Sequence, residues 1–245
     1  MAKCGFESEL FRKPTKLRKP VGNNIKMTKE LMTIENSLME TISDNGAKDI
    51  ISEMGELTLD AIIENDTIDQ IPIIGTLKSI YKITNSISDH LFIQKLLKFI
   101  NELGNLSEKE KAEMRSKIDN DKKYQNRIGE SLLEIINKID DSDKPEIIAK
   151  IFKSFISGFI ELEEFIEFSQ IVNRSYLPDL MNLCIFNSGQ TLSNEYSGSL
   201  LSAGLIQIRQ VTSSGEVSLR SLSEQEPYEY ILNSKGEKLN AILIS

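Results

Sequence analysis

Few residues of this 245-residue chain have the types and spacing that catalysis requires. Its one histidine, His90, could act as a general base, because an unperturbed imidazole titrates near neutral pH. It stands between Asp89 and Leu91, however, and the sequence has no serine or cysteine in a context typical of a catalytic nucleophile. The glycine-rich loops G-x-x-x-x-G-K-S/T and G-x-G-x-x-G, which hold phosphates, are absent. We therefore interpret His90 as a surface or packing residue and expect the protein not to be an enzyme.

One segment has part of the spacing of a calcium-binding loop. Asp119, Asp121 and Glu130 stand at positions 1, 3 and 12 of a twelve-residue loop. Position 5 is Lys123 and position 6 is Tyr124, where the loop needs an oxygen ligand and a glycine. A lysine ammonium among the ligands would repel the ion, so we interpret this segment as the solvated start of a helix.

The two cysteines, Cys4 and Cys184, suggest neither a metal site nor a disulfide framework. Together with one histidine they are too few for a four-ligand zinc site. Their scarcity favours a reducing cytoplasm. No apolar run reaches the ~18 residues of a membrane-spanning helix, and none follows the basic N-terminal residues as in a secretory signal. We expect a cytoplasmic protein without a cofactor, with the inner face of the membrane as an alternative location.

Charge is distributed unevenly along the chain. Residues 1–29 hold eight Lys/Arg and two Glu, whereas the whole chain has a net charge of −8. This asymmetry is typical of an acidic body with a basic arm, and prolines 14 and 20 favour a flexible arm over residues 1–27. If the protein binds nucleic acid, we expect the arm to supply the phosphate contacts. The candidate residues are Arg12, Lys13, Lys16, Arg18 and Lys19.

Apolar residues recur at three- and four-residue steps from Thr28 onward, which predicts a helical bundle over residues 28–175. Helices are expected over about 47–64, 71–103, 123–139, 144–156 and 161–173. Ser107 and Glu110 have the spacing of a capping box, and Gly158 is expected to turn one helix into the next.

The segment 71–103 is expected to be the longest helix, one continuous amphipathic element that ends at Gly104. Four lysines stand beside its apolar stripe, a combination that also occurs in helices that lie on membranes. Packing in the core of a bundle predicts the same pattern, and amphipathicity alone does not separate the two. The stripe that would contact either the core, a partner or lipid comprises Leu77, Ile80, Tyr81, Leu91 and Leu96.

The last 70 residues form a separate expected unit, residues 176–245. The run 199–208 predicts a helix that ends at Gly204 and continues as a strand, and 228–239 predicts a strand and a short helix. This order resembles the L-x-x-x-G-L-I … Y-x-L-T-x-x-G ending of winged-helix domains. The helix that would enter a DNA groove, about Asn194 to Ala203, has no Lys or Arg and one Glu. Because binding of duplex DNA depends on Lys and Arg side chains, the unit is expected to contact protein rather than DNA.

A second resemblance concerns the body. Two stretches of the body resemble a group of bacterial and prophage proteins, some of them linked to phage resistance. These are the run 71–75 leading into 95–100, and the pair of segments 150–153 and 163–166 around Gly158. The resemblance implies a role in phage defence. It carries no catalytic residue.

These observations predict a mainly helical protein, a multi-helix bundle followed by a small winged-helix-like α+β unit. The function expected first is that of a non-enzymatic interaction or regulatory module that assembles with itself or with a protein partner. The alternatives are a membrane-acting effector that uses the 71–103 helix and a DNA-binding regulator that uses the basic arm. No small-molecule substrate is evident from the residues.

Overall fold

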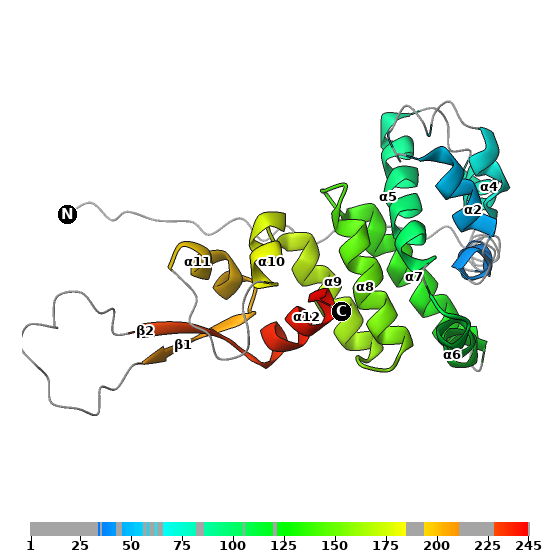
Figure 1. The fold of residues 1–245 in the computed structure, drawn as a ribbon. Helices are drawn as coiled ribbons and strands as arrows, with labels where there is room; N and C mark the ends of the chain where they lie inside the picture. The colour runs from blue at the N-terminus through cyan, green and yellow to red at the C-terminus, as the bar shows by residue number, and fades with distance from the viewer. Residues whose placement is uncertain are drawn as a thin grey trace, which may run out of the picture.

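The computed structural model describes residues 46–55, 66–81, 86–104, 106–119, 122–184, 194–210 and 228–244, with positions 34, 36–42, 58 and 62 (Figure 1). Helices predominate in this part of the chain, and the two described strands form one antiparallel sheet. The mainly helical class is therefore confirmed. The basic arm, 1–27, lies outside the described residues, and so do its five candidate phosphate contacts.

The first elements pack as short helices. Helix α2 spans Gly46–Met54, and the 3₁₀ turn η1 spans Asp66–Gln70. The expected single helix over 47–64 is interrupted: α2 ends before Gly55, whose φ of 71° is readily adopted only by glycine, although Ile62 is helical again. Helix α4, Pro72–Tyr81, begins at a proline, as expected at a first helical turn.

The expectation of one helix over 71–103 is wrong. Helix α4 ends at Tyr81, and a second helix, α5, spans Ile87–Leu103. Ser86 has extended backbone angles, φ −81° and ψ 144°, and its side chain accepts a hydrogen bond from the amide of Asp89 at 3.2 Å. A serine in this position satisfies an amide that has no partner in the first turn, so it starts a new helix.

The break divides the apolar stripe. Leu77 and Leu96 are buried, and Ile80 packs at the edge of the core, whereas Leu91 is 40% exposed. The side chain of Tyr81 lies outside the described residues. With 3.6 residues per turn, Leu91 lies on the side of α5 opposite its buried residues. Those buried residues are Ile93, Leu96, Leu97, Phe99, Ile100 and Leu103.

Four helices follow along the chain: α6 (Glu108–Asp119), α7 (Lys122–Lys138), α8 (Lys144–Ile156) and α9 (Leu162–Arg174). Helix α8 packs against both α5 and α9. Four phenylalanines meet there with ring centroids 5.4 to 6.0 Å apart: Phe99, Phe152, Phe155 and Phe165. The Ser107–Glu110 capping box is present, and Gly158 turns the chain with a φ of 78°.

The C-terminal elements are α10 (Leu177–Leu183), α11 (Asn194–Ser202), β1 (Ile206–Gln210), β2 (Tyr228–Leu232) and α12 (Ser234–Ile244). The two expected strands are confirmed, and Gly204 connects α11 to β1 with a φ of 75°. Figure 1 shows the paired strands extending away from the helices, whereas α12 packs against α8. The domain boundary near residue 176 stays a prediction.

Helix α12 is joined to the bundle by three lysines. Lys238 pairs with Glu164 at 2.6 Å, Lys235 pairs with Glu167, and the ammonium of Lys150 donates to the carbonyl of Leu243 at 3.2 Å. The Lys150 contact places the last turn of α12 beside the middle of α8, and the two ion pairs join the first half of α12 to α9.

The Glu164 contact predicts a dependence on pH. The hydrogen bond from Lys238 lowers the pKa of Glu164 below its ordinary value of 4.5. A lowered folded-state pKa means that the stabilisation is present above 4.5 and is lost as the pH falls through the lowered value. We expect wild-type protein to be more resistant to urea than Glu164→Gln at neutral pH. Urea titrations should show this difference close on acidification; a difference that persists well below the lowered pKa would contradict it.

Candidate functional site

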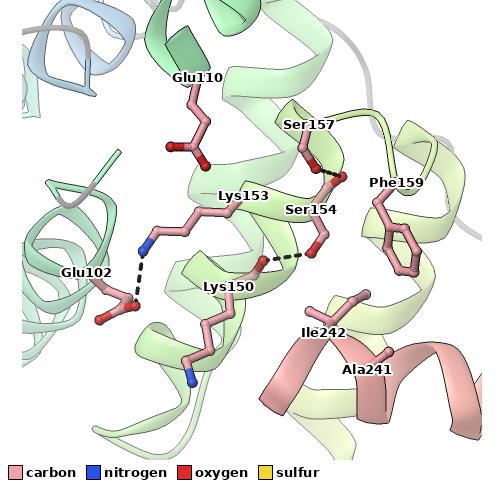
Figure 2. A pocket seen from close by; sticks show the side chains of 9 residues that line it. All are labelled: Glu102, Glu110, Lys150, Lys153, Ser154, Ser157, Phe159, Ala241 and Ile242. Atoms are coloured by element: carbon pink, nitrogen blue, oxygen red, sulfur yellow. Dashed lines mark hydrogen bonds and ion pairs between the residues drawn. The ribbon is translucent and has the colours of Figure 1, made fainter. Parts of the chain in front are cut away.

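A cavity of about 690 Å³ lies where α12 meets the bundle (Figure 2). Its walls come from α5, α6, α8, the turn that follows α8, and α12. Six of its nine lining residues have charged or hydroxyl side chains, and Phe159, Ala241 and Ile242 form an apolar wall. Elements that are far apart in the sequence therefore build one concave surface.

The serines of this cavity are not arranged as nucleophiles. Ser154 donates its hydroxyl to the carbonyl of Lys150 at 3.3 Å, and Ser157 donates to the carbonyl of Ser154 at 3.0 Å. A catalytic serine would instead donate to a base such as histidine. Lys153 forms an ion pair with Glu102 at 3.1 Å. The lining groups therefore fit binding better than covalent catalysis.

Glu110 is held at the edge of the cavity by the start of its own helix. Its carboxylate accepts hydrogen bonds from the hydroxyl of Ser107 at 2.6 Å and from the Ser107 amide at 2.7 Å. These bonds, and the positive charge of Lys153, lower the pKa of Glu110. It is therefore a carboxylate at neutral pH.

The catalytic and metal candidates of the sequence lie elsewhere. His90 is partly exposed on α5 and does not line this cavity. Asp119 ends α6 and Glu130 is exposed on α7, whereas Asp121 lies outside the described residues. Among the described residues, no three His, Cys, Asp or Glu side chains are grouped to hold a metal ion. No helix in the same part of the chain has both the length and the apolar character to cross a membrane.

A second candidate surface is one face of the β1–β2 ribbon, which we call the ribbon face: Ile206, Ile208, Tyr228, Tyr230 and Leu232. Directly opposed residues of an antiparallel pair point to the same side, and here Ile206 faces Leu232 and Ile208 faces Tyr230. Ile206 and Leu232 are buried. Ile208 and Tyr228 are 52% and 53% exposed. The ribbon face therefore begins in the core and continues into solvent.

The opposite face of the ribbon is polar beside Ile208 and Tyr228. Arg209 faces Glu229, and the two side chains form an ion pair at 2.5 Å. Gln207 is also exposed there, opposite Ile231, which is partly buried. Apolar and polar side chains alternate along a strand of which one face is buried. In this ribbon the alternation continues beyond the part that the core covers.

Helix α11 lacks cations on its exposed surface. Its sequence contains no Lys or Arg, and Leu201 is 39% exposed. The hydroxyl of Ser199 donates to the carboxylate of Asp179 at 2.5 Å, which places a negative charge beside this helix. Phosphates would find no counter-charge on α11 itself.

Neither the cavity nor the exposed extent of the ribbon face was identified from the sequence. The alternation of apolar and polar residues in 206–208 and 228–232 was the available signal for the ribbon face, whereas the cavity depends on contacts between distant helices.

Comparison with protein-family models, curated proteins and solved structures found no match.

Proposed function

We propose that the protein is a non-enzymatic interaction module, and that its C-terminal unit pairs with a second copy of the chain through the ribbon face. The observation that carries the proposal is that this apolar face extends beyond the core and is exposed to solvent there. Ile208 and Tyr228 are large residues, and about half of the surface of each is exposed to water. Exposed apolar patches of this kind mark sites of association.

The charge of the chain is compatible with a second copy as the occupant only at an uncharged face. The net charge is −8, so two copies repel each other over most of their surfaces. The ribbon face contains no charged residue, and the nearby Arg209–Glu229 pair is neutral as a unit. Two copies can therefore meet there without bringing like charges together.

The C-terminal unit is proposed to be winged-helix-like. Its order of helix, helix, strand, strand and helix supports this, and so do its two pattern glycines. Gly204 needs a positive φ, and a Cβ on Gly236 would lie 2.0 Å from the carbonyl oxygen of Leu205. Binding of duplex DNA by α11 is not proposed, because that helix offers no cation. A role in phage defence stays a prediction.

We expect the association to be weak. Each described strand has five residues, so the ribbon face is smaller than the ~800 Å² per partner of a standard stable interface. A dimer that dissociates on dilution is the expected behaviour.

Placing an aspartate on the ribbon face should abolish association. In Ile208→Asp, two carboxylates would be brought together at an apolar contact, which costs several times the thermal energy. Sedimentation equilibrium over a range of concentrations is expected to show a monomer–dimer equilibrium for wild type and monomer alone for the variant.

Gln207→Asp is the matched control, because it adds the same charge one residue away on the opposite face. It should self-associate nearly as wild type does. A wild-type chain that stays monomeric at every concentration, or equal losses in both variants, would contradict the proposal.

A further inference from the structure

The cavity beside α12 has a polar wall and an apolar wall. Figure 2 shows Glu102, Glu110 and Lys153 on one side of it. Phe159 and Ile242 lie on the other side. The volume of about 690 Å³ lies within the range of small-molecule sites. A molecule that contacts both walls must therefore be polar on one side and apolar on the other.

The charges of the polar wall alternate. Figure 2 shows its charged side chains in the order Glu110, Lys153, Glu102 and Lys150. The ammonium of Lys153 pairs with Glu102 at 3.1 Å and, together with Lys109, acts electrostatically on Glu110. The ammonium of Lys150 donates to the carbonyl of Leu243 at 3.2 Å, and Lys150 also borders a second cavity. A charged group of a ligand would meet a like charge beside each opposite one, so this wall favours an uncharged ligand.

The polar wall still offers acceptors and donors for hydrogen bonds. Glu102 and Glu110 each have one carboxylate oxygen without a partner among the described residues. The ammonium of Lys153 retains N–H groups that Glu102 does not use. The oxygens of Ser154 and Ser157 can also accept, since their hydrogens are donated to backbone carbonyls. Hydroxyl groups fit such a wall, because each one donates and accepts at the same oxygen.

The apolar wall leaves a large aromatic residue in water. Phe159 is half exposed, and Ala241 beside it is exposed as well. The ammonium of Lys238 lies 5.8 Å from the ring centroid of Phe159, so it covers only part of the ring. Covering the rest with C–H groups would remove apolar surface from water, which is favourable. A sugar ring has such C–H groups on its faces and hydroxyl groups around its edge.

We propose that this cavity binds an uncharged sugar, of the class of a monosaccharide or disaccharide. Its hydroxyl groups would form hydrogen bonds with Glu102, Glu110 and Lys153. Its C–H groups would pack against Phe159 and Ile242. This goes beyond the interaction module proposed above, because the sugar site lies on the bundle and α12 and not on the ribbon.

Isothermal titration calorimetry of the full chain tests the ligand class. The probes are glucose, galactose, mannose, maltose and cellobiose. Each monosaccharide is compared with its uronic acid and its amino sugar at about pH 6, where the amine is protonated. Cyclohexanol has a ring of similar size with a single hydroxyl group. At least one neutral sugar is expected to bind with a dissociation constant of about 1 mM or lower, and about tenfold more tightly than cyclohexanol or a charged analogue. Absence of binding by all five sugars, or equal binding by a charged analogue or cyclohexanol, would overturn the proposal.

Two variants test the assigned walls. Glu110→Gln keeps a side chain that can complete the capping box, but it replaces the remaining carboxylate oxygen by an amide donor. Phe159→Ala removes the aromatic ring of the apolar wall. Each should weaken binding of the tightest sugar about tenfold while circular dichroism stays unchanged. If Phe159→Ala loses helical content, Phe159→Gln replaces it, because glutamine keeps a long side chain without the apolar ring.

Glu134→Gln and Ile87→Ala are the matched controls. Glu134 is exposed on α7 and Ile87 is 72% exposed at the start of α5, and neither lines the cavity. Both controls should leave the affinity for the sugar unchanged. Wild-type affinity in both cavity variants, or equal losses in the controls, would overturn the assignment of the site.

Discussion

Gly236→Ala should destabilise the protein by about 3 kcal/mol, as expected for overpacking against atoms that cannot move aside. An added Cβ would lie 2.0 Å from the carbonyl oxygen of Leu205 and 3.0 Å from its carbonyl carbon. These are backbone atoms, so the first turn of α12 must move away from β1. The movement would strain the hydrogen bonds of Asn233, which donates to the carbonyl of Gly204 at 2.9 Å and accepts from the amide of Gly236 at 2.9 Å.

Urea unfolding followed by circular dichroism measures this effect. Gly198→Ala is the matched control, because Gly198 is exposed on α11 and an added Cβ there would meet nothing within 4 Å. Alanine favours a helix over glycine by about 1 kcal/mol, so this second variant should be slightly more stable than wild type. Equal unfolding midpoints for Gly236→Ala and wild type would show that β1 and α12 do not approach each other as described.

Leu96→Asp should unfold the protein or destabilise it by more than about 4 kcal/mol, since it places an unpaired carboxylate in an apolar core. Leu96 is fully buried on the side of α5 that contains the other buried residues of that helix. Leu91→Asp introduces the same group on the opposite side, where Leu91 is 40% exposed. There we expect a change within about 0.5 kcal/mol, as for most surface substitutions.

The comparison of these two variants also bears on the membrane alternative. Circular dichroism and urea titration should show loss of helix or a large shift for Leu96→Asp alone. If Leu96→Asp instead retained wild-type helicity and its unfolding midpoint, the stripe would be available to lipid and not committed to the core.

Local signals in the sequence predicted the caps and turns well. Ser107–Glu110, Gly158 and Gly204 each act within a few residues of their own position, so their effects can be derived from spacing alone. The break before α5 was also visible in principle, since Ser86 and Asp89 have the spacing of a helix start. The apolar residues before and after this break recur with the same helical period, so the periodicity alone indicated one continuous helix.

The cavity could not be predicted in this way. Lys153 and Glu102 are 51 positions apart, and Lys150 and Leu243 are 93 positions apart. Their meeting depends on how α5 and α12 pack against α8, which is a property of the assembled core. For the same reason, alternation in the strands indicates which side of the ribbon is apolar but not how far the core covers it.

The most direct test of the proposed function is to identify what lies on the ribbon face in solution. A benzophenone photo-crosslinker would replace Tyr228 on that face, and Gln207 on the opposite face in a control. Isotope-labelled and unlabelled chains would be mixed, so that mass spectrometry separates contacts between copies from contacts within one. We predict a crosslinked dimer from position 228, joined to the ribbon of the second copy, and little from position 207. No crosslinked dimer from position 228, or equal yields from both positions, would contradict pairing through the ribbon face.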